Sequence, residues 1–157
     1  MTNHTRFALL ALVLCAVLVA GARHASAATK KTTLHTRSAV LGAQAVKVAR
    51  RYLGVRYVYG GSSPHSGFDC SGLVRYVFGR VGIALPHSSY AQFDLGHRVA
   101  RGSLRPGDLV FFDGVGHVGI YIGGGRFIHA PHTGTRVSVA SLAGWYSARY
   151  DGARRLA

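Results

Sequence analysis

The amino-acid sequence predicts a single α+β domain, with helices in the first half of the chain and an antiparallel β-sheet in the second. Its 157 residues suit one compact domain, and a hydrophobic content of 48% is enough for a packed core. Apolar residues recur at helical spacing up to about residue 81, whereas beyond residue 105 short β-branched and aromatic runs are separated by glycine-rich turns. Helices followed by strands favour an architecture in which a helix packs on the sheet.

The N-terminus has the three regions of a secretory signal peptide, residues 1–27. The basic start MTNHTR is followed by the apolar run FALLALVLCAVLVA and by HASAATKK, which contains a small-residue cleavage pattern ending at Ala27. Cleavage there would leave a secreted or periplasmic, envelope-associated protein without a membrane span. A retained anchor is the alternative, which the shortness of the apolar run disfavours. Lipidation of Cys15 is not expected, because Leu14 is bulky where a lipoprotein site has a small residue.

Residues 28–37 are expected to form a short basic linker, and residues 38–157 a single domain. Ser38 can cap a helix that Gly54 ends, and the residues predicted to line its buried face are Val40, Ala43, Val46, Ala49 and Leu53. The linker is too short to fold as a wall-binding or groove-closing domain. We expect a monomer without such a domain.

A second predicted helix begins near Cys70, and its apolar stripe consists of Leu73, Val74, Val77, Phe78 and Val81. The chain has two cysteines, and signal cleavage would remove Cys15, so Cys70 could form no disulfide within the mature protein. An unpaired thiol in an exported protein is either buried or used. A helix N-terminus favours the thiolate. Buried filler and nucleophile both remain open for Cys70 at this point.

Two of the nine histidines are placed where they could serve that thiol. His117 opens the predicted strand HVGIYI, and His129 lies in the returning strand RFIHA. If residues 123–125 form a three-residue loop, Gly119 pairs with His129 and both imidazoles share one face, whereas a two-residue loop would place them on opposite faces. One imidazole could then act as a base that the other orients. Metal binding by both histidines and Cys70 is disfavoured, because no close-spaced ligand pair supports it.

The chain is strongly basic, with 19 Lys and Arg against 5 Asp and Glu and a formal net charge of +14. This balance favours association with polyanions, and export narrows these to the acidic polymers of a cell envelope. The alternative is a basic soluble surface without a specific partner. No long run of like charge or aromatic–basic stripe indicates a groove for nucleic acid. The last residues, WYSARYDGARRLA, are compatible with a final strand or a basic tail.

Five stretches together resemble the NlpC-type cell-wall cysteine peptidases, a family with a papain-like fold. They cover the chain from about Leu41 to Arg155, in the family's order, and read YVYGGSSPHSGFDCSGLVRYVF, LPHSSYAQF, LRPGDLVFF, GHVGIYIGGGRFIHAP and YSARYDGARR. The patterns FDCSGLV and HVGIYIG together carry the resemblance. It implies a secreted cysteine endopeptidase that acts on peptidoglycan stem peptides without a metal or organic cofactor.

The resemblance also implies a role for each matching residue. Cys70 would be the nucleophile, and His117 its general base and later the acid that protonates the leaving amine. His129 would orient His117. The hydroxyl of Tyr57 would hold the oxyanion together with the backbone N–H of Cys70.

Three further residues match positions that hold the free amino end of a stem peptide in some members: Asp69, Ser71 and Ser89. The charge of Asp69 opposes ionisation of the adjacent Cys70, so its expected purpose is to pair with a substrate ammonium. Its alternative role, compatible with the first, is to cap the helix by accepting backbone N–H bonds. The chain departs from the family at His87, where many relatives have arginine, and this affects the expected details of the substrate groove.

The resemblance favours cleavage between γ-D-glutamyl and a diamino acid, while compact single-domain members can instead cut the D-alanyl cross-link. A thiol amidase or acyltransferase could use the same residues. A non-catalytic, basic wall-binding module would keep the fold without needing Cys70, His117 and His129 together. The presence of all three favours the hydrolase.

Overall fold

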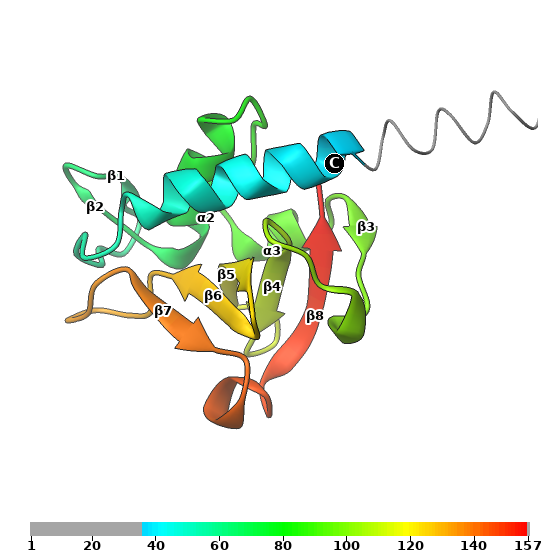
Figure 1. Cartoon of the computed structure of the whole chain (residues 1–157). Helices are drawn as coiled ribbons and strands as arrows, with labels where there is room; N and C mark the ends of the chain where they lie inside the picture. Colours follow the sequence, from blue (N-terminus) through cyan, green and yellow to red (C-terminus); the bar gives the residue numbers. More distant parts are fainter. Residues whose placement is uncertain (1–35, 157) are drawn as a thin grey trace, which may run out of the picture. The chain divides into compact units, whose positions relative to one another are not determined.

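The structure is a computed structural model that describes residues 36–156 (Figure 1). Within this range, the residues from Ser38 onward form one compact unit. The predicted signal peptide, residues 1–27, and residues 28–35 of the predicted linker lie outside the described residues. None of the helices between residues 36 and 156 is long and apolar enough to cross a membrane.

Residues 36–50 are helical and are drawn in cyan in Figure 1. Ser38 lies inside this helix, so its prediction as a cap was wrong: the two residues before it already have helical backbone. The buried face consists of Ala45, Val46 and Ala49, whereas the other three residues assigned to it from their spacing are exposed: Val40, Ala43 and Leu53. Leu53 comes after the last helical residue and cannot continue the face. The core therefore lies under the second half of the helix.

Helix α2 (Cys70–Gly79) begins at the predicted nucleophile. Asp69 precedes it in an extended conformation, and its carboxylate accepts a hydrogen bond from the Gly72 N–H at 2.7 Å, which makes it the N-cap. The predicted stripe is buried at Leu73, Val74, Val77 and Phe78. The start of α2 is thus fixed by its cap and by the packing of its apolar side chains.

A short hairpin leads into α2. Strand β1 (Ser62–Ser63) pairs with β2 (Gly67–Phe68), and Phe68 is fully buried. The next backbone N–H, that of Asp69, donates to the Gly61 carbonyl at 3.0 Å. Main-chain bonds therefore hold the loop that delivers the chain to Cys70.

A six-stranded antiparallel sheet forms most of the second half of the domain (Figure 1). Its strands, in the spatial order β3-β8-β4-β5-β6-β7, are β3 (His97–Arg98), β8 (Tyr150–Arg155), β4 (Leu109–Phe112), β5 (His117–Gly123), β6 (Arg126–His129) and β7 (Ser138–Ser141). The predicted meander corresponds to β4 through β7. The last residues form β8, which pairs with both β3 and β4 and is not a free tail. Helix α3 (Ser89–Phe93) lies between α2 and β3 in the chain.

The hairpin of β5 and β6 brings His117 and His129 together by a route that differs from the predicted loop. Gly123 pairs with Arg126, so the loop has two residues and not three. The register shifts just before Gly123, which leaves a β-bulge at residue 122. A two-residue loop alone would place the two imidazoles on opposite faces of the sheet, and the extra residue in the bulge returns them to the same face. Both histidines therefore lie on one face, with ring centroids 5.1 Å apart.

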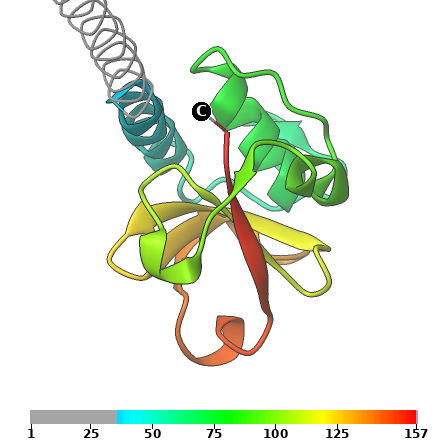
Figure 2. The ribbon, with the colours of Figure 1, turned by 90° about the vertical axis from the view of Figure 1, so that its right-hand side faces the viewer.

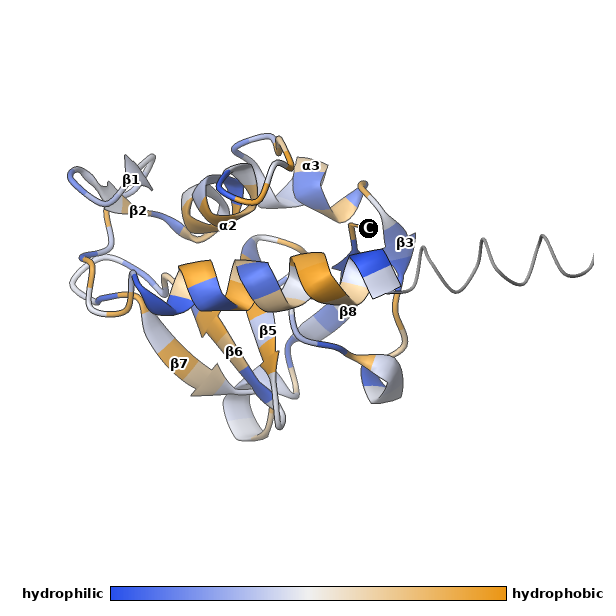
Figure 3. Ribbon diagram, turned by 45° about the horizontal axis from the view of Figure 1, so that its top comes forward, coloured by the Kyte–Doolittle hydropathy of each residue, from blue (hydrophilic) through white to orange (hydrophobic). Residues whose placement is uncertain are grey.

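Two hydrophobic clusters cover the two faces of the sheet. Side chains of β4 alternate between the two clusters. Leu109 and Phe111 belong to the cluster that contains the α2 side chains, and Val110 and Phe112 belong to the cluster on the opposite face of the sheet. Figure 2 shows the first helix and α2 on one side of the sheet, and Figure 3 shows hydrophobic and hydrophilic segments alternating along the first helix. The predicted α+β architecture is confirmed.

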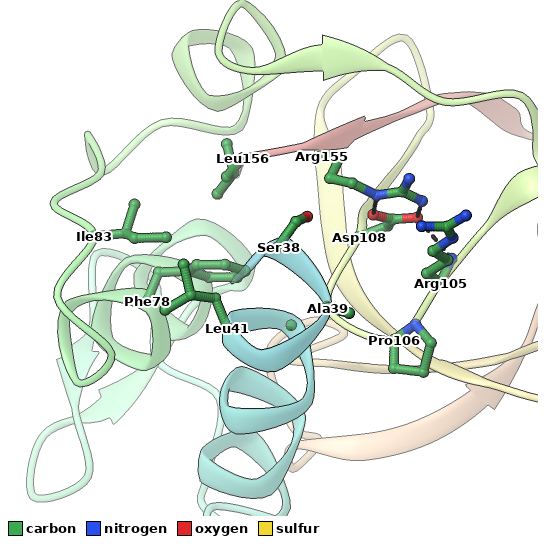
Figure 4. A pocket seen from close by; sticks show the side chains of 12 residues that line it. Ser38, Ala39, Leu41, Phe78, Ile83, Arg105, Pro106, Asp108, Arg155 and Leu156 are labelled. Atoms are coloured by element: carbon green, nitrogen blue, oxygen red, sulfur yellow. Dashed lines mark hydrogen bonds and ion pairs between the residues drawn. The ribbon is translucent and has the colours of Figure 1, made fainter. Parts of the chain in front are cut away.

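An ion pair fastens the end of β8 to the residue before β4 (Figure 4). Nε and Nη2 of Arg155 each lie 2.7 Å from an oxygen of Asp108, which is 1% exposed. The hollow beside the pair has a volume of about 20 Å³. This is room for a water molecule and too little for an organic ligand. The hollow is therefore part of the packing of the domain.

Candidate active site

Cys70 lies in a cleft formed by the start of α2, the loop ahead of it and α3. The volume of the cleft is about 420 Å³, in the range of ligand sites. It is lined by Tyr57, Tyr59, Gly60, Asp69, Cys70, Ser71, His87, Ser88, Ser89, Tyr90 and Gly116. All four residues predicted to bind the substrate or oxyanion therefore share one cleft with the predicted nucleophile. Gly116 comes directly before His117, so the same cleft reaches the start of β5.

The Cys70 side chain is a thiol in the free protein. Burial raises its pKa, and the charge of Asp69 raises it further. Hydrogen bonds from the backbone N–H groups of Val118, Ser71 and Cys70 itself lower the pKa without cancelling the rise. The helix N-terminus thus acts in the expected direction, but burial has the larger effect. The bond from Val118 also places the sulfur against the residue that follows His117.

His117 and His129 are hydrogen-bonded to each other, with 2.8 Å between Nε2 of His117 and Nδ1 of His129. Burial lowers the pKa of His117 to about 4 and that of His129 to about 3. The carboxylate of Asp113 opposes the shift in His117 without cancelling it. Both rings are therefore neutral near pH 7, and a single proton occupies the bond between them. Since Nε2 of His117 is engaged by His129, Nδ1 is the other ring nitrogen of His117 and the candidate acceptor for a thiol proton.

Tyr146 is a neighbour of this pair that the sequence did not single out. It ends a short 3-10 helix (Gly144–Tyr146), and its hydroxyl oxygen lies 3.5 Å from Nδ1 of His129. Its ring is tilted by 25° from that of His117 and by 88° from that of His129. The only available signal was an aromatic pair in WYSARY, a segment whose place in the fold depends on how β7 and β8 join the sheet.

Asp69 is 8% exposed, and both of its carboxylate oxygens are occupied. Oδ1 accepts from the Gly72 N–H at 2.7 Å and the Ser71 hydroxyl at 3.1 Å, and Oδ2 accepts from the Gly60 N–H at 2.9 Å. Nε2 of His87 lies 2.8 and 2.9 Å from the two oxygens. The carboxylate therefore caps α2 and holds His87. Its binding of a substrate amine stays a prediction.

Tyr57 precedes Cys70 in the sequence and Ser89 follows it, and both line the cleft. Burial raises the pKa of Tyr57, and so does the charge of an ionised Cys70. Ser89 is buried at the start of α3. Tyr59 and Tyr90, which the sequence did not single out, also line the cleft and are 88% and 62% exposed. The roles predicted for Tyr57 and Ser89 stay predictions.

A thiol at a helix N-terminus, beside antiparallel strands that carry two hydrogen-bonded histidines, is the arrangement of a papain-like cysteine peptidase domain. Between residues 36 and 156, no group of three or more His, Cys, Asp or Glu side chains is arranged to hold a metal ion. The chain belongs to the NlpC/P60 family, whose model matches residues 54–155.

Two curated proteins and one solved structure illustrate the similarity. The chain is 44% identical to the gamma-DL-glutamyl hydrolase of Bacillus subtilis over 117 residues, which cover 70% of this chain and 28% of that protein. It is 43% identical to the murein DD-endopeptidase MepH of Escherichia coli over 126 residues, 72% of this chain and 46% of that protein. The crystal structure of a family member from Bacillus cereus matches with a TM-score of 0.69 and 36% identity, covering 73% of this chain and 39% of that one. The chain thus spans less than half the length of these relatives.

Proposed function

We propose that the protein is an exported peptidoglycan hydrolase that cuts amide bonds of stem peptides, with Cys70 as nucleophile and His117 as its base. One observation carries the proposal. The sulfur of Cys70 is hydrogen-bonded by Val118, and the preceding residue, His117, has its Nε2 engaged by His129. Nδ1 of His117 is thereby left for the thiol proton. Membership of the NlpC/P60 family supports the same assignment.

Catalysis starts from a neutral thiol and a neutral imidazole. As a substrate carbonyl enters the cleft, Nδ1 of His117 accepts the Sγ proton and the sulfur attacks the carbonyl carbon. The imidazolium then gives this proton to the departing amine, and the acyl group remains on Cys70 as a thioester. A water molecule deprotonated by His117 hydrolyses the thioester and regenerates the thiol. His129 keeps the His117 ring in place through both steps.

The oxyanion that forms during each attack would be held by the Tyr57 hydroxyl and the Cys70 backbone N–H. Both residues line the cleft. Because burial and a nearby charge on Cys70 raise the pKa of Tyr57, the phenol keeps its proton and can donate it in a hydrogen bond. This donor would act most strongly when negative charge develops on the carbonyl oxygen.

The bond between γ-D-glutamyl and a diamino acid is our first choice of target. Its support is the similarity to a protein named gamma-DL-glutamyl hydrolase. The alternative is the D-alanyl cross-link, supported by the similarity to a protein named murein DD-endopeptidase. A thiol amidase or acyltransferase would use the same residues and differ only in its products.

The free amino end of the stem peptide is proposed to bind at Asp69, Ser71 and Ser89. Because both oxygens of Asp69 already have partners, a substrate ammonium would replace one of them instead of adding to them. His87 is the partner that can leave, since its side chain is 23% exposed and the others belong to the backbone or to a buried serine. Substrate binding should therefore move His87.

The basic surface is proposed to contact anionic polymers of the envelope after export. Three of the five aspartates pair with basic side chains: Asp69 with His87, Asp108 with Arg155 and Asp113 with Arg149. These pairs leave little negative charge to offset the remaining arginines. A net positive surface would concentrate the protein at a polyanionic wall and weaken with added salt.

The test is digestion of purified peptidoglycan with the wild-type protein and with Cys70→Ala, followed by mass spectrometry of the fragments. The wild type should release fragments with new amino ends, and these ends name the bond. Cys70→Ala should release none, with circular dichroism showing that it is folded. If both proteins, or neither, release the same fragments while folded, the hydrolase proposal is wrong.

A further inference from the structure

Tyr146 connects the histidine pair to the hydrophobic cluster on its face of the sheet. Its ring packs against Phe112 and Phe127, with centroids 5.0 and 4.9 Å away. The same ring contacts His117 at 6.4 Å and His129 at 5.3 Å between centroids. The Tyr146 ring is therefore packed between this hydrophobic cluster and the two imidazole rings.

These contacts restrict the planes of both imidazole rings. Phe112 lies 6.2 Å from His117 and Phe127 lies 4.9 Å from His129, and the two histidines share Tyr146 as a neighbour. The short bond between the rings needs Nε2 of His117 and Nδ1 of His129 to point at each other. Rotation of either ring would break this bond and press on the tyrosine.

The position of the shared proton decides whether His117 can act as a base. If the proton is on Nδ1 of His129, His117 carries its own proton on Nδ1 and has no lone pair for the Cys70 thiol. If the proton is on Nε2 of His117, Nδ1 of His117 is an acceptor. Two neutral imidazoles do not by themselves favour the second arrangement.

The hydroxyl of Tyr146 can bias this choice, because its oxygen lies 3.5 Å from Nδ1 of His129. A phenol can donate to that nitrogen only when the nitrogen has a lone pair. Burial raises the pKa of Tyr146, and the charge of Asp113 raises it further, so the phenol keeps its proton. In the arrangement with Nε2 of His117 protonated, Tyr146 donates to the same lone pair of Nδ1 as Nε2–H, as the weaker half of a bifurcated bond; in the other arrangement its oxygen would instead accept from Nδ1–H.

We propose that Tyr146 is a positioning residue: its ring fixes the planes of His117 and His129, and its hydroxyl keeps Nδ1 of His129 an acceptor. Nδ1 of His117 then faces the thiol without a proton. The proposal rests on the proposed function, in which His117 is the base for Cys70. Tyr146 itself exchanges no proton during the reaction.

Kinetics of Tyr146→Phe and Tyr146→Leu separate the hydroxyl from the ring. Tyr146→Phe should lower kcat by about 2- to 10-fold with KM unchanged, because one weak hydrogen bond is lost. Tyr146→Leu should lower kcat further, because both imidazole planes loosen. The matched control is Tyr150→Phe: Tyr150 also packs on Phe112, at 6.0 Å, but its buried hydroxyl has no hydrogen-bond partner in the described part of the chain. It should keep the wild-type kcat.

Side-chain ¹⁵N NMR at pH 7 reads the tautomers without any substrate. The wild type and Tyr150→Phe should show Nε2–H and an unprotonated Nδ1 on both His117 and His129, and Tyr146→Phe should show a mixture. Protonated Nδ1 on His129 in the wild type, or identical spectra for the wild type and Tyr146→Phe, would overturn the role of the hydroxyl. A wild-type kcat in folded Tyr146→Leu would overturn the role of the ring.

Failure of this proposal can be told from failure of the proposed function. If the wild type cuts no peptidoglycan, the hydrolase proposal fails, while the spectra still decide whether Tyr146 sets the tautomer. If Tyr146→Leu does not fold, the spectrum and kcat of Tyr146→Phe give the decision. Thermal unfolding of each variant, measured alongside, shows which values come from folded protein.

Discussion

The buried histidine pair should make the domain lose stability in acid. Burial lowers the pKa of His117 and His129 from 6.5 to about 4 and about 3 in the folded chain. Between these values and 6.5, the unfolded chain binds more protons than the folded one. The stability that the neutral pair contributes is therefore fully present above pH 6.5 and is lost as the pH falls through the window.

The size of the effect follows from the two shifts. One pKa unit corresponds to about 1.4 kcal/mol, so His129 contributes on the order of 5 kcal/mol and His117 on the order of 3 kcal/mol. These contributions belong to the hydrogen-bonded pair and not to either ring alone, because protonation of one ring makes protonation of the other harder. A loss of several kcal/mol by about pH 4 is a large part of the ~5–15 kcal/mol that stabilises a domain.

Urea unfolding at a series of pH values from 7.5 to 4.5 measures this loss. His129→Gln keeps an acceptor for His117 but cannot become charged, so its free energy of unfolding should fall less steeply with acid than that of the wild type. His97→Gln is the matched control, because His97 is exposed on β3 at the far edge of the sheet, and it should keep the wild-type slope. A flat wild-type profile, or equal slopes for His129→Gln and the wild type, would refute the reasoning.

Two further predictions concern stability. In α2, Gly72→Ala should prevent folding or lower the free energy of unfolding by more than about 2 kcal/mol, because the added Cβ would overlap the Gly61 carbonyl oxygen. Gly79→Ala should raise it by up to about 1 kcal/mol, because the added Cβ meets nothing within 4 Å. Equal urea midpoints for the two variants would contradict this. Arg155→Met should cost about 3–5 kcal/mol, because it leaves the buried carboxylate of Asp108 without its charge partner; an unchanged thermal midpoint at pH 7 would show that the ion pair does not matter.

The elements whose apolar residues follow a clear local pattern could be predicted from the sequence. The features that depend on how strands pair with one another could not. The stripe of α2 and the short β-branched and aromatic runs of β4 through β7 reflect burial directly. The bulge at residue 122 has no local signature, so the two histidines were placed correctly on one face by a wrong loop length. Ser38 failed as a cap because a serine is also tolerated inside a helix.

The candidate site was predictable where its chemistry is rare. Cys70, the one cysteine outside the predicted signal peptide, and two histidines in neighbouring predicted strands stand out in the sequence, whereas Tyr146 reaches them only because β7 and β8 join the same sheet. The ionisation of Cys70 was not predictable, because the sequence shows the helix start and the adjacent carboxylate but not the burial that raises the thiol pKa most. The occupied oxygens of Asp69 likewise involve Gly60 and His87, which lie elsewhere in the chain.

Formation of a thioester on Cys70 is the central claim, and intact-protein mass spectrometry tests it most directly. The substrate is a stem peptide whose scissile amide is replaced by an activated ester, so that acylation outpaces hydrolysis and the intermediate accumulates before an acid quench. The wild type should gain the mass of the acyl half, and fragmentation should place it on the peptide that contains Cys70. Cys70→Ala should gain nothing. An adduct on another residue, or product release by the Cys70→Ala variant, would contradict the assignment of the nucleophile.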